Sequence, residues 1–195
     1  MITENPIFGL KVQNLAINTI RNEFAAYLEL LAEDGFVQGL RMVKNPVDLP
    51  LFTWKWLPRG AMTLILQRSI LGVESCVSAA VSYQLGAMGL LTPEKAAELN
   101  DPVKLPGKGN GMANTFYNKL PAQIDQGLPL ETMDPDLWAV VTRLYKEVRN
   151  PLFHGYELSE TNPAGVLEAL KVLQRLYEWM DSWWGCFQKQ QPAKL

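Results

Sequence analysis

The 195-residue sequence has very little of what builds a metal centre or a disulfide framework, since it contains one histidine and two cysteines. Cys76 and Cys186 lie far apart in apolar helical patterns, where a free cysteine usually behaves as a small hydrophobic residue. A zinc site needs more histidine and cysteine ligands than this, and no pair of carboxylates stands at metal-binding spacing. We therefore expect no metal ion, no cofactor and a reducing compartment.

Charge is also scarce, because charged residues make up 19% of the chain and the net charge is −2. This balance provides no broad attraction for a polyanion, so any contact with RNA must depend on a local basic patch. Residues 1–6 lack the basic start and the apolar run of a secretory signal. Serine, glutamine and glycine dilute the charge-free stretch Ser75–Leu91, which favours a buried core helix over a membrane span. We expect a cytoplasmic protein that does not enter a membrane.

The motifs of several common enzyme classes are missing. No serine or cysteine stands in a motif that links a nucleophile to a base, as a nucleophile elbow would. The run Gly107–Gly111 contains a lysine, but it lacks the Gly-Lys-Ser/Thr order and the preceding strand of a phosphate-binding loop. A flexible loop is the favoured interpretation. No alternating strand pattern, internal repeat or low-complexity tract is evident, and this predicts an all-α protein.

Apolar residues at three- and four-residue spacing predict helices along most of the chain. The predicted helices cover about residues 10–33, 61–90, 92–99, 134–149 and 162–187. Three of them begin with a capping side chain followed by proline, at Thr92, Asp134 and Asn162. The second helix carries one continuous apolar stripe, made of Met62, Leu66, Ile70, Val73, Val77, Val81, Leu85 and Met88. The broad apolar face of the last helix needs several helical partners, which predicts an up-and-down helical bundle.

The remaining segments are predicted to connect or pair these helices. Residues 36–58 combine prolines with tryptophans, which favours an ordered connector folded onto the core. Residues 100–112 are rich in glycine and proline, which favours an exposed loop. A stripe of small residues from Gly72 to Gly89 would let another helix approach closely, from the same chain or from another subunit. At this length we expect a single domain, residues 1–195.

The single histidine lies where a predicted helix meets a turn, in the sequence Arg-Asn-Pro-Leu-Phe-His from Arg149 to His154. Asn150 can cap a new turn begun by Pro151, which would place Asn150 and His154 on one face with Arg149 beside them. A guanidinium binds phosphate bidentately, and an imidazole exchanges protons near neutral pH. This combination suits phosphodiester chemistry without a metal.

The same residues also allow a purely structural interpretation. A lone histidine beside a turn is often only a hydrogen-bonding partner, and Arg149 with Asn150 could cap carbonyl groups at the end of the helix. Glu74, the one acid within the long apolar helix, is interpreted as a satisfied structural carboxylate rather than a catalytic group.

At Arg149, Asn150 and His154 the sequence resembles the HEPN superfamily, named for higher eukaryotes and prokaryotes nucleotide-binding domains. The family signature is an arginine, commonly followed by Asn, Asp or His, and then a histidine after four to six intervening residues; here four residues intervene. The resemblance covers about residues 134–187 and implies a helical bundle. In many members the motif is the active site of a metal-independent endoribonuclease, with two copies meeting across a dimer interface. Other members are non-catalytic or pair with a nucleotidyltransferase.

Carried over to this chain, the resemblance implies that His154 deprotonates a ribose 2′-hydroxyl, that Arg149 stabilises charge on the scissile phosphate, and that Asn150 orients them. The resulting prediction is a dimeric, metal-independent endoribonuclease of the toxin or defence type. The alternative is a non-catalytic helical dimerisation module that binds a nucleotide or a protein partner, such as a nucleotidyltransferase antitoxin. Residues 36–58 and 100–130 look like additions to the family pattern, so no RNA substrate is implied.

Overall fold

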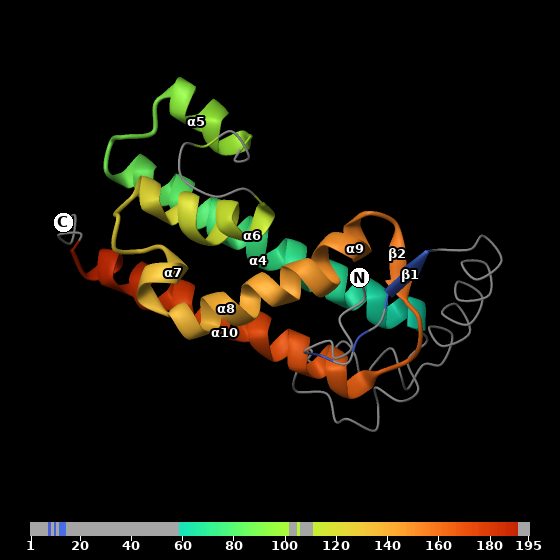
Figure 1. Ribbon diagram of the computed structural model, residues 1–195. Coiled ribbons are helices and arrows are strands. Elements are labelled where there is room, and N and C mark those ends of the chain that lie inside the picture. Colours follow the sequence, from blue (N-terminus) through green and yellow to red (C-terminus); the bar gives the residue numbers. More distant parts are fainter. Residues whose placement is uncertain are drawn as a thin grey trace, which may run out of the picture. The chain divides into compact units, whose positions relative to one another are not determined.

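The computed structural model describes residues 8, 10, 12–14, 59–101, 105 and 111–190, and the side chains of 12–14 and 184–190 are excluded from that description. The chain divides into two compact units, one of residues 1–70 with 146–171 and the other of residues 71–145 with 172–195. Figure 1 shows that the described part is mostly helical, as the sequence predicted. The connector 36–58 and most of the predicted helix 10–33 lie outside the described residues. That the chain is one domain stays a prediction.

The longest element is helix α4, Arg59–Ala87, which confirms the predicted long apolar helix. Its stripe is buried from Met62 to Leu85, whereas Met88 lies beyond the helix and is 45% exposed. The helix ends in a tight turn in which the N–H of Leu90 donates to the carbonyl of Leu85 at 2.8 Å. Gly89 allows this turn because its φ of 72° is strained for residues with a side chain.

Helix α4 is also long and apolar enough to cross a membrane by length and composition alone. The core helix of a soluble protein passes the same test, so this property does not decide between the two. The buried stripe is the pattern of a core helix. Absence from the membrane and a cytoplasmic location therefore stay predictions.

All three predicted helix starts are confirmed by side-chain caps. The N–H of Lys95 donates to the Thr92 hydroxyl at 3.2 Å and opens α5, Pro93–Asn100. The N–H of Leu137 donates to the Asp134 carboxylate at 2.8 Å and opens α8, Pro135–Leu144. Asn162 accepts from the N–H of Gly165 at 3.0 Å, and α10 follows as Pro163–Gln190. Each cap satisfies a backbone donor that the first helical turn leaves without a partner.

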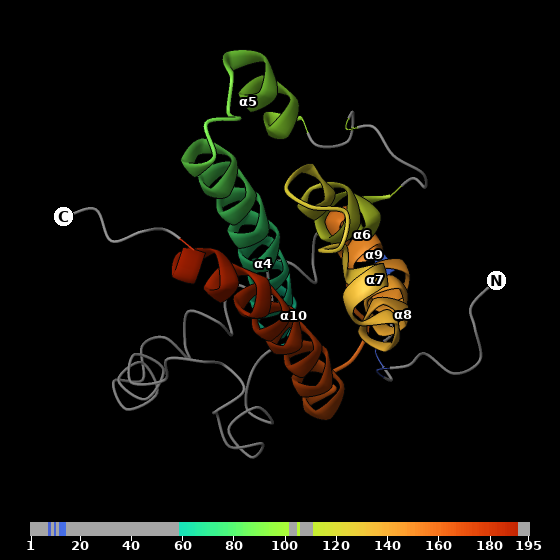
Figure 2. The same cartoon turned by 90° about the vertical axis from the view of Figure 1, so that its left-hand side faces the viewer.

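Within the second unit, four shorter helical segments lie between α5 and α8 in the chain. They are α6 (Met112–Asn114), the π-helix η3 (Thr115–Lys119), the 3₁₀-helix η4 (Pro121–Gln123) and α7 (Leu130–Met133). Two of them, α6 and α7, contact α8. Figures 1 and 2 show α6, α7 and α8 gathered together, while α5 stands apart from α7 and α8 in both views.

A second π-helix, η5 (Tyr145–Arg149), continues α8, and α9 (Asn150–Phe153) follows it directly. Each π-helix ends two residues before a proline, η3 before Pro121 and η5 before Pro151. Proline has no N–H, and its ring clashes with the carbonyl group four residues earlier. The wider π turn accommodates this clash without breaking the helix. At Pro151 the proline therefore does not start an independent helix, since α9 already begins at Asn150, whereas Pro121 begins the short 3₁₀-helix η4.

The first unit contains a two-stranded antiparallel ladder that the sequence did not predict. Strand β1, Val12–Asn14, pairs with β2, Tyr156–Leu158, so that Val12 lies opposite Leu158. Residues 12–14 are thus a strand rather than the start of the predicted helix, while the described part of the chain remains all-α in class because each strand has only three residues. Three residues are too few to show an alternating apolar pattern, and the partner strand lies far along the chain, so the sequence gives no signal for this pairing.

The N-terminal residues around β1 pack closely on α10. Phe8 and Leu10 are buried, at 8% and 3% exposure. A side chain at Gly165 would overlap the carbonyl oxygen of Phe8, so only glycine permits this approach. The close contact places the segment just before β1 against α10 within the first unit.

Candidate active site

The motif residues lie within about one helical turn, from the last residue of η5 to the residue that follows α9. Arg149 ends η5, Asn150 begins α9, and His154 follows the last residue of α9. The backbone N–H of His154 donates to the carbonyls of Asn150, at 3.1 Å, and of Pro151, at 3.0 Å. Gly155, with a φ of 86°, then turns the chain into β2. The backbone of His154 is therefore fixed by two hydrogen bonds.

The capping role predicted for Asn150 was wrong. The residue at the cap position of α9 is Arg149, which has helical dihedral angles, and no side-chain hydrogen bond caps this turn. The reason is the π turn before Pro151, which lets the helix continue where a new helix was expected. Asn150 and His154 are nevertheless linked across one turn, because the Asn150 carbonyl accepts from the His154 N–H.

Three polar side chains at four-residue spacing along α4 hold the segment that follows Arg149. Gln67 donates from its amide to the carbonyl of Leu152 at 2.9 Å. The hydroxyl of Thr63 accepts from the N–H of Leu158 at 3.3 Å, and Arg59 donates to the carbonyl of Ser159 at 2.8 Å. These three residues, named here the α4 clamp, attach both α9 and β2 to α4. Sequence reasoning missed the clamp, whose only signal is a polar stripe beside the apolar one.

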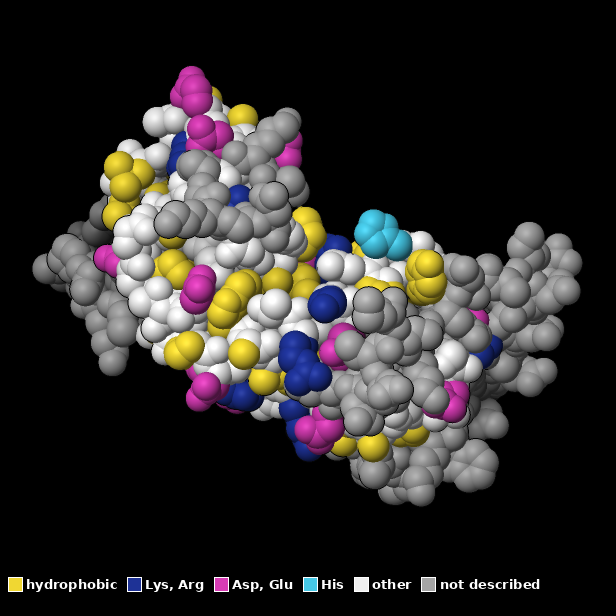
Figure 3. Space-filling model, in the orientation of Figure 1, with side chains coloured by type: hydrophobic (Ala, Val, Ile, Leu, Met, Phe, Trp, Pro, Cys, Tyr) yellow, Lys and Arg dark blue, Asp and Glu magenta, His cyan; other side chains and the backbone are white. Residues whose placement is uncertain are grey.

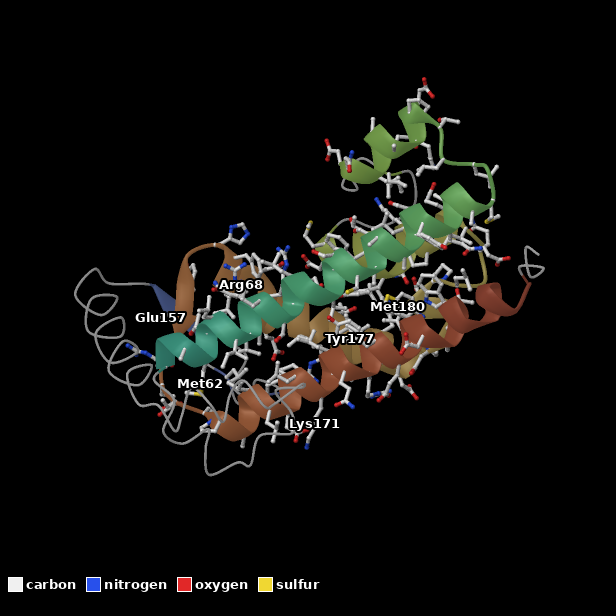
Figure 4. All side chains as sticks on the ribbon, turned by 180° about the vertical axis from the view of Figure 1, so that it is seen from behind. Met62, Arg68, Glu157, Lys171, Tyr177 and Met180 are labelled. Atoms are coloured by element: carbon white, nitrogen blue, oxygen red, sulfur yellow. The ribbon has the colours of Figure 1, made fainter. Side chains whose placement is uncertain are left out.

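A buried ion pair strengthens one end of the clamp. The side chain of Glu157 is only 3% exposed, and one of its carboxylate oxygens lies 3.3 Å from a guanidinium nitrogen of Arg59. Figure 4 labels Glu157 beside the first turn of α4. Removing Arg59 would leave the Glu157 carboxylate buried without this compensating charge, which typically costs about 3–5 kcal/mol.

The three motif residues differ in their access to solvent. Arg149 is only 9% exposed, and its guanidinium carbon lies 4.4 Å above the centre of the Phe153 ring. Asn150 is half-buried, and His154 is exposed. Figure 3 shows the histidine, in cyan, projecting from the surface with dark-blue Lys and Arg side chains beside it. An imidazole on a fixed backbone can thus reach a ligand from solvent, while Arg149 supports the turn from within.

The second unit contains a contrasting polar cluster. The hydroxyl of Tyr145 donates to the carboxylate of Glu74 at 2.8 Å, and it lies 2.7 Å from the hydroxyl of Tyr117. Glu74 is 3% exposed and Tyr145 is 2% exposed. Burial, reinforced by the negative charge that Tyr117 and Glu74 can carry, raises the pKa of Tyr145 well above its usual range. Tyr145 therefore stays a hydrogen-bond donor, and Glu74 is a satisfied buried carboxylate, while its lack of a catalytic role stays a prediction.

Other features of the described ranges lie apart from the motif. No group of three or more His, Cys, Asp or Glu side chains among those residues is placed to hold a metal ion. A cavity of about 250 Å³ in the second unit is lined by none of the motif residues; its lining is Met133, Asp134, Leu137, Arg175, Glu178, Trp179 and Ser182. The exposed turn at His154 is therefore the strongest candidate for chemistry.

Comparison with known proteins assigns no relative to the chain. No family model, no curated protein and no solved structure matches it. The likeness to the HEPN superfamily accordingly rests on Arg149, Asn150 and His154 and on their helical setting.

Proposed function

We propose that this chain is a metal-independent endoribonuclease in which His154 acts as the general base. The observation that carries the proposal is an exposed imidazole whose backbone is held by two hydrogen bonds and by the α4 clamp. A general base must reach its proton at hydrogen-bonding distance, and a fixed position lowers the entropic cost of that encounter. The residue types beside it, an arginine and an asparagine, suit a phosphate ligand.

In the proposed reaction, a ring nitrogen of His154 takes the proton of a ribose 2′-hydroxyl. The oxygen then attacks the adjacent phosphorus, the bond to the 5′-oxygen breaks, and a proton donor completes the departing hydroxyl. The products are a 2′,3′-cyclic phosphate and a 5′-hydroxyl end. Asn150 orients the reacting groups. Arg149, being buried on the Phe153 ring, contributes positive potential and holds the turn in place.

The proton donor is proposed to come from a second copy of the chain. Phosphodiester cleavage benefits from both a base and an acid, and each chain has a single histidine. A two-fold dimer would bring two copies of His154 to one cleft. Adding an excess of His154→Ala protein to the wild type should then lower cleavage per wild-type chain, whereas an active monomer would be unaffected. A toxin of this kind would have a cognate antitoxin or nucleotidyltransferase as partner.

A second candidate is a non-catalytic helical module that binds a nucleotide or a protein partner. The burial of Arg149 favours it, because a guanidinium engaged with Phe153 presents little surface to a scissile phosphate. This module would bind its partner without cleaving RNA, and His154→Ala would leave that binding intact.

The deciding experiment measures cleavage of a mixed pool of single-stranded RNAs in excess chelator. Wild type should cleave the RNA and leave 2′,3′-cyclic phosphate ends, and His154→Ala should not. Lys146→Ala, a change at another exposed residue of the same helical run, is the matched control and should retain most of the activity. Cleavage that stops in chelator, or that survives in His154→Ala, would contradict the mechanism. Absence of cleavage by the wild type would favour the non-catalytic module.

A further inference from the structure

A second arginine lies next to the candidate site on α4. Arg68 directly follows Gln67, whose amide is bonded to the Leu152 carbonyl two residues before His154. Its side chain is exposed, and it forms no hydrogen bond or ion pair with any residue in the described part of the chain. Figure 4 shows Arg68 on the edge of α4 beside α9, whereas Lys171 projects from α10 on the opposite side.

Arg68 and Arg149 are therefore in opposite situations. The guanidinium of Arg149 is buried and engaged with Phe153, while that of Arg68 faces solvent without a carboxylate partner in the described ranges. A solvent-facing guanidinium can form two parallel hydrogen bonds with the oxygens of a phosphate. Because the net charge of the chain is −2, any affinity for RNA has to come from such local cations.

We propose that Arg68 binds a phosphate of the RNA beside His154 and so performs the contact that the burial of Arg149 restricts. This inference rests on the proposed function, because it places RNA on the surface around His154. Gln67 has a different, positioning role. Its side-chain amide donates a hydrogen bond to the Leu152 carbonyl, and this contact sets the position of α9 relative to Arg68. The surface around His154 thus combines a general base, which directly follows α9, with a phosphate-binding arginine on α4.

The test measures binding of a single-stranded RNA with 2′-O-methyl riboses, which cannot be cleaved, by fluorescence anisotropy at several salt concentrations. Arg68→Ala should weaken binding about tenfold and reduce the slope of log affinity against log salt by about 0.7, as expected for one lost phosphate contact on a single strand. Arg68→Lys should restore part of the affinity. Lys171→Ala is the matched control, since Lys171 is an exposed cation of the same unit that is paired with Glu168 at 2.7 Å, and its binding should equal that of the wild type.

The two proposals fail in different ways. If the wild type cleaves RNA and needs His154, but Arg68→Ala binds like Lys171→Ala, the Arg68 assignment is wrong and the ribonuclease stands. If the wild type binds RNA through Arg68 but cleaves none, the phosphate contact stands and the ribonuclease is wrong. Wild-type protein that binds no RNA would overturn both. Circular dichroism of each variant confirms that it is folded, which is expected because Arg68 is exposed.

Discussion

The cluster around Glu74 and the turn around His154 use similar polar groups in opposite ways. Glu74 and Tyr145 are both buried, and the Tyr145 hydroxyl donates to the Glu74 carboxylate. At His154, hydrogen bonds hold the backbone and leave the imidazole exposed. A buried group with its partners inside the core supports stability, whereas an exposed group on a fixed backbone can act on a ligand. Mutation of the two regions should therefore affect different measurements.

The largest expected effect is the loss of cleavage in His154→Ala. Removing a general base typically lowers the rate by about 10²- to 10⁴-fold. Because the His154 side chain is exposed, its removal should change the free energy of unfolding by less than about 0.5 kcal/mol. Cleavage assays and urea denaturation of the same preparation measure the two effects. A strongly destabilised His154→Ala would show that the imidazole is structural and would remove the contrast with Glu74.

The opposite result is expected for Tyr145→Phe. This change removes the donor to Glu74 and leaves a buried carboxylate with one hydrogen bond fewer, which should lower the free energy of unfolding by about 1–3 kcal/mol. Cleavage by the remaining folded protein should be close to that of the wild type. Urea denaturation measures the change, and Tyr83→Phe, at an exposed tyrosine of α4, is the control. A loss of cleavage without loss of stability would show that this buried cluster serves the chemistry.

A smaller effect is expected for Gln67→Ala, which removes one member of the α4 clamp. The Leu152 carbonyl would lose its donor, and the free energy of unfolding should fall by about 1 kcal/mol. Cleavage should fall several-fold at the same time, because α9 would no longer be held against α4. Hydrogen exchange of the His154 amide should become faster. Unchanged exchange would mean that the two backbone bonds of His154 hold the turn without the clamp.

The smallest expected effect is a change in stability at high pH. The pKa of Tyr145 is raised in the folded protein, so the neutral hydroxyl stabilises the fold below about pH 10, the usual pKa of tyrosine, and this contribution is lost as the pH rises further. The pKa of Tyr177 is also raised, to about 12, by partial desolvation and by the neighbouring Cys76 thiol. The melting temperature, measured from pH 8 to 11, should decline more steeply for the wild type than for Tyr145→Phe. Parallel curves would contradict the role assigned to Tyr145.

The elements that could be predicted from the sequence are those that depend on near neighbours along the chain. Thr92, Asp134 and Asn162 each cap a helix through a backbone donor three residues later, so their effect is local. The buried stripe of α4 follows from the helical repeat alone. The choice of the only histidine as a candidate also comes from composition, and the structure places it exposed at a helix end, while its catalytic role stays a proposal.

Tertiary structure alone decided the burial of Arg149 and which distant segments of the chain meet. Arg149 became buried on Phe153, although its residue type favours the surface. Strand β1 depends on β2, which lies more than a hundred residues further along the chain, and Gln67 bonds a carbonyl group 85 residues away. Local patterns cannot specify such pairs, because each backbone donor or carbonyl looks alike in the sequence. Packing selects the partner, and this selection left Arg68 exposed on α4 beside α9.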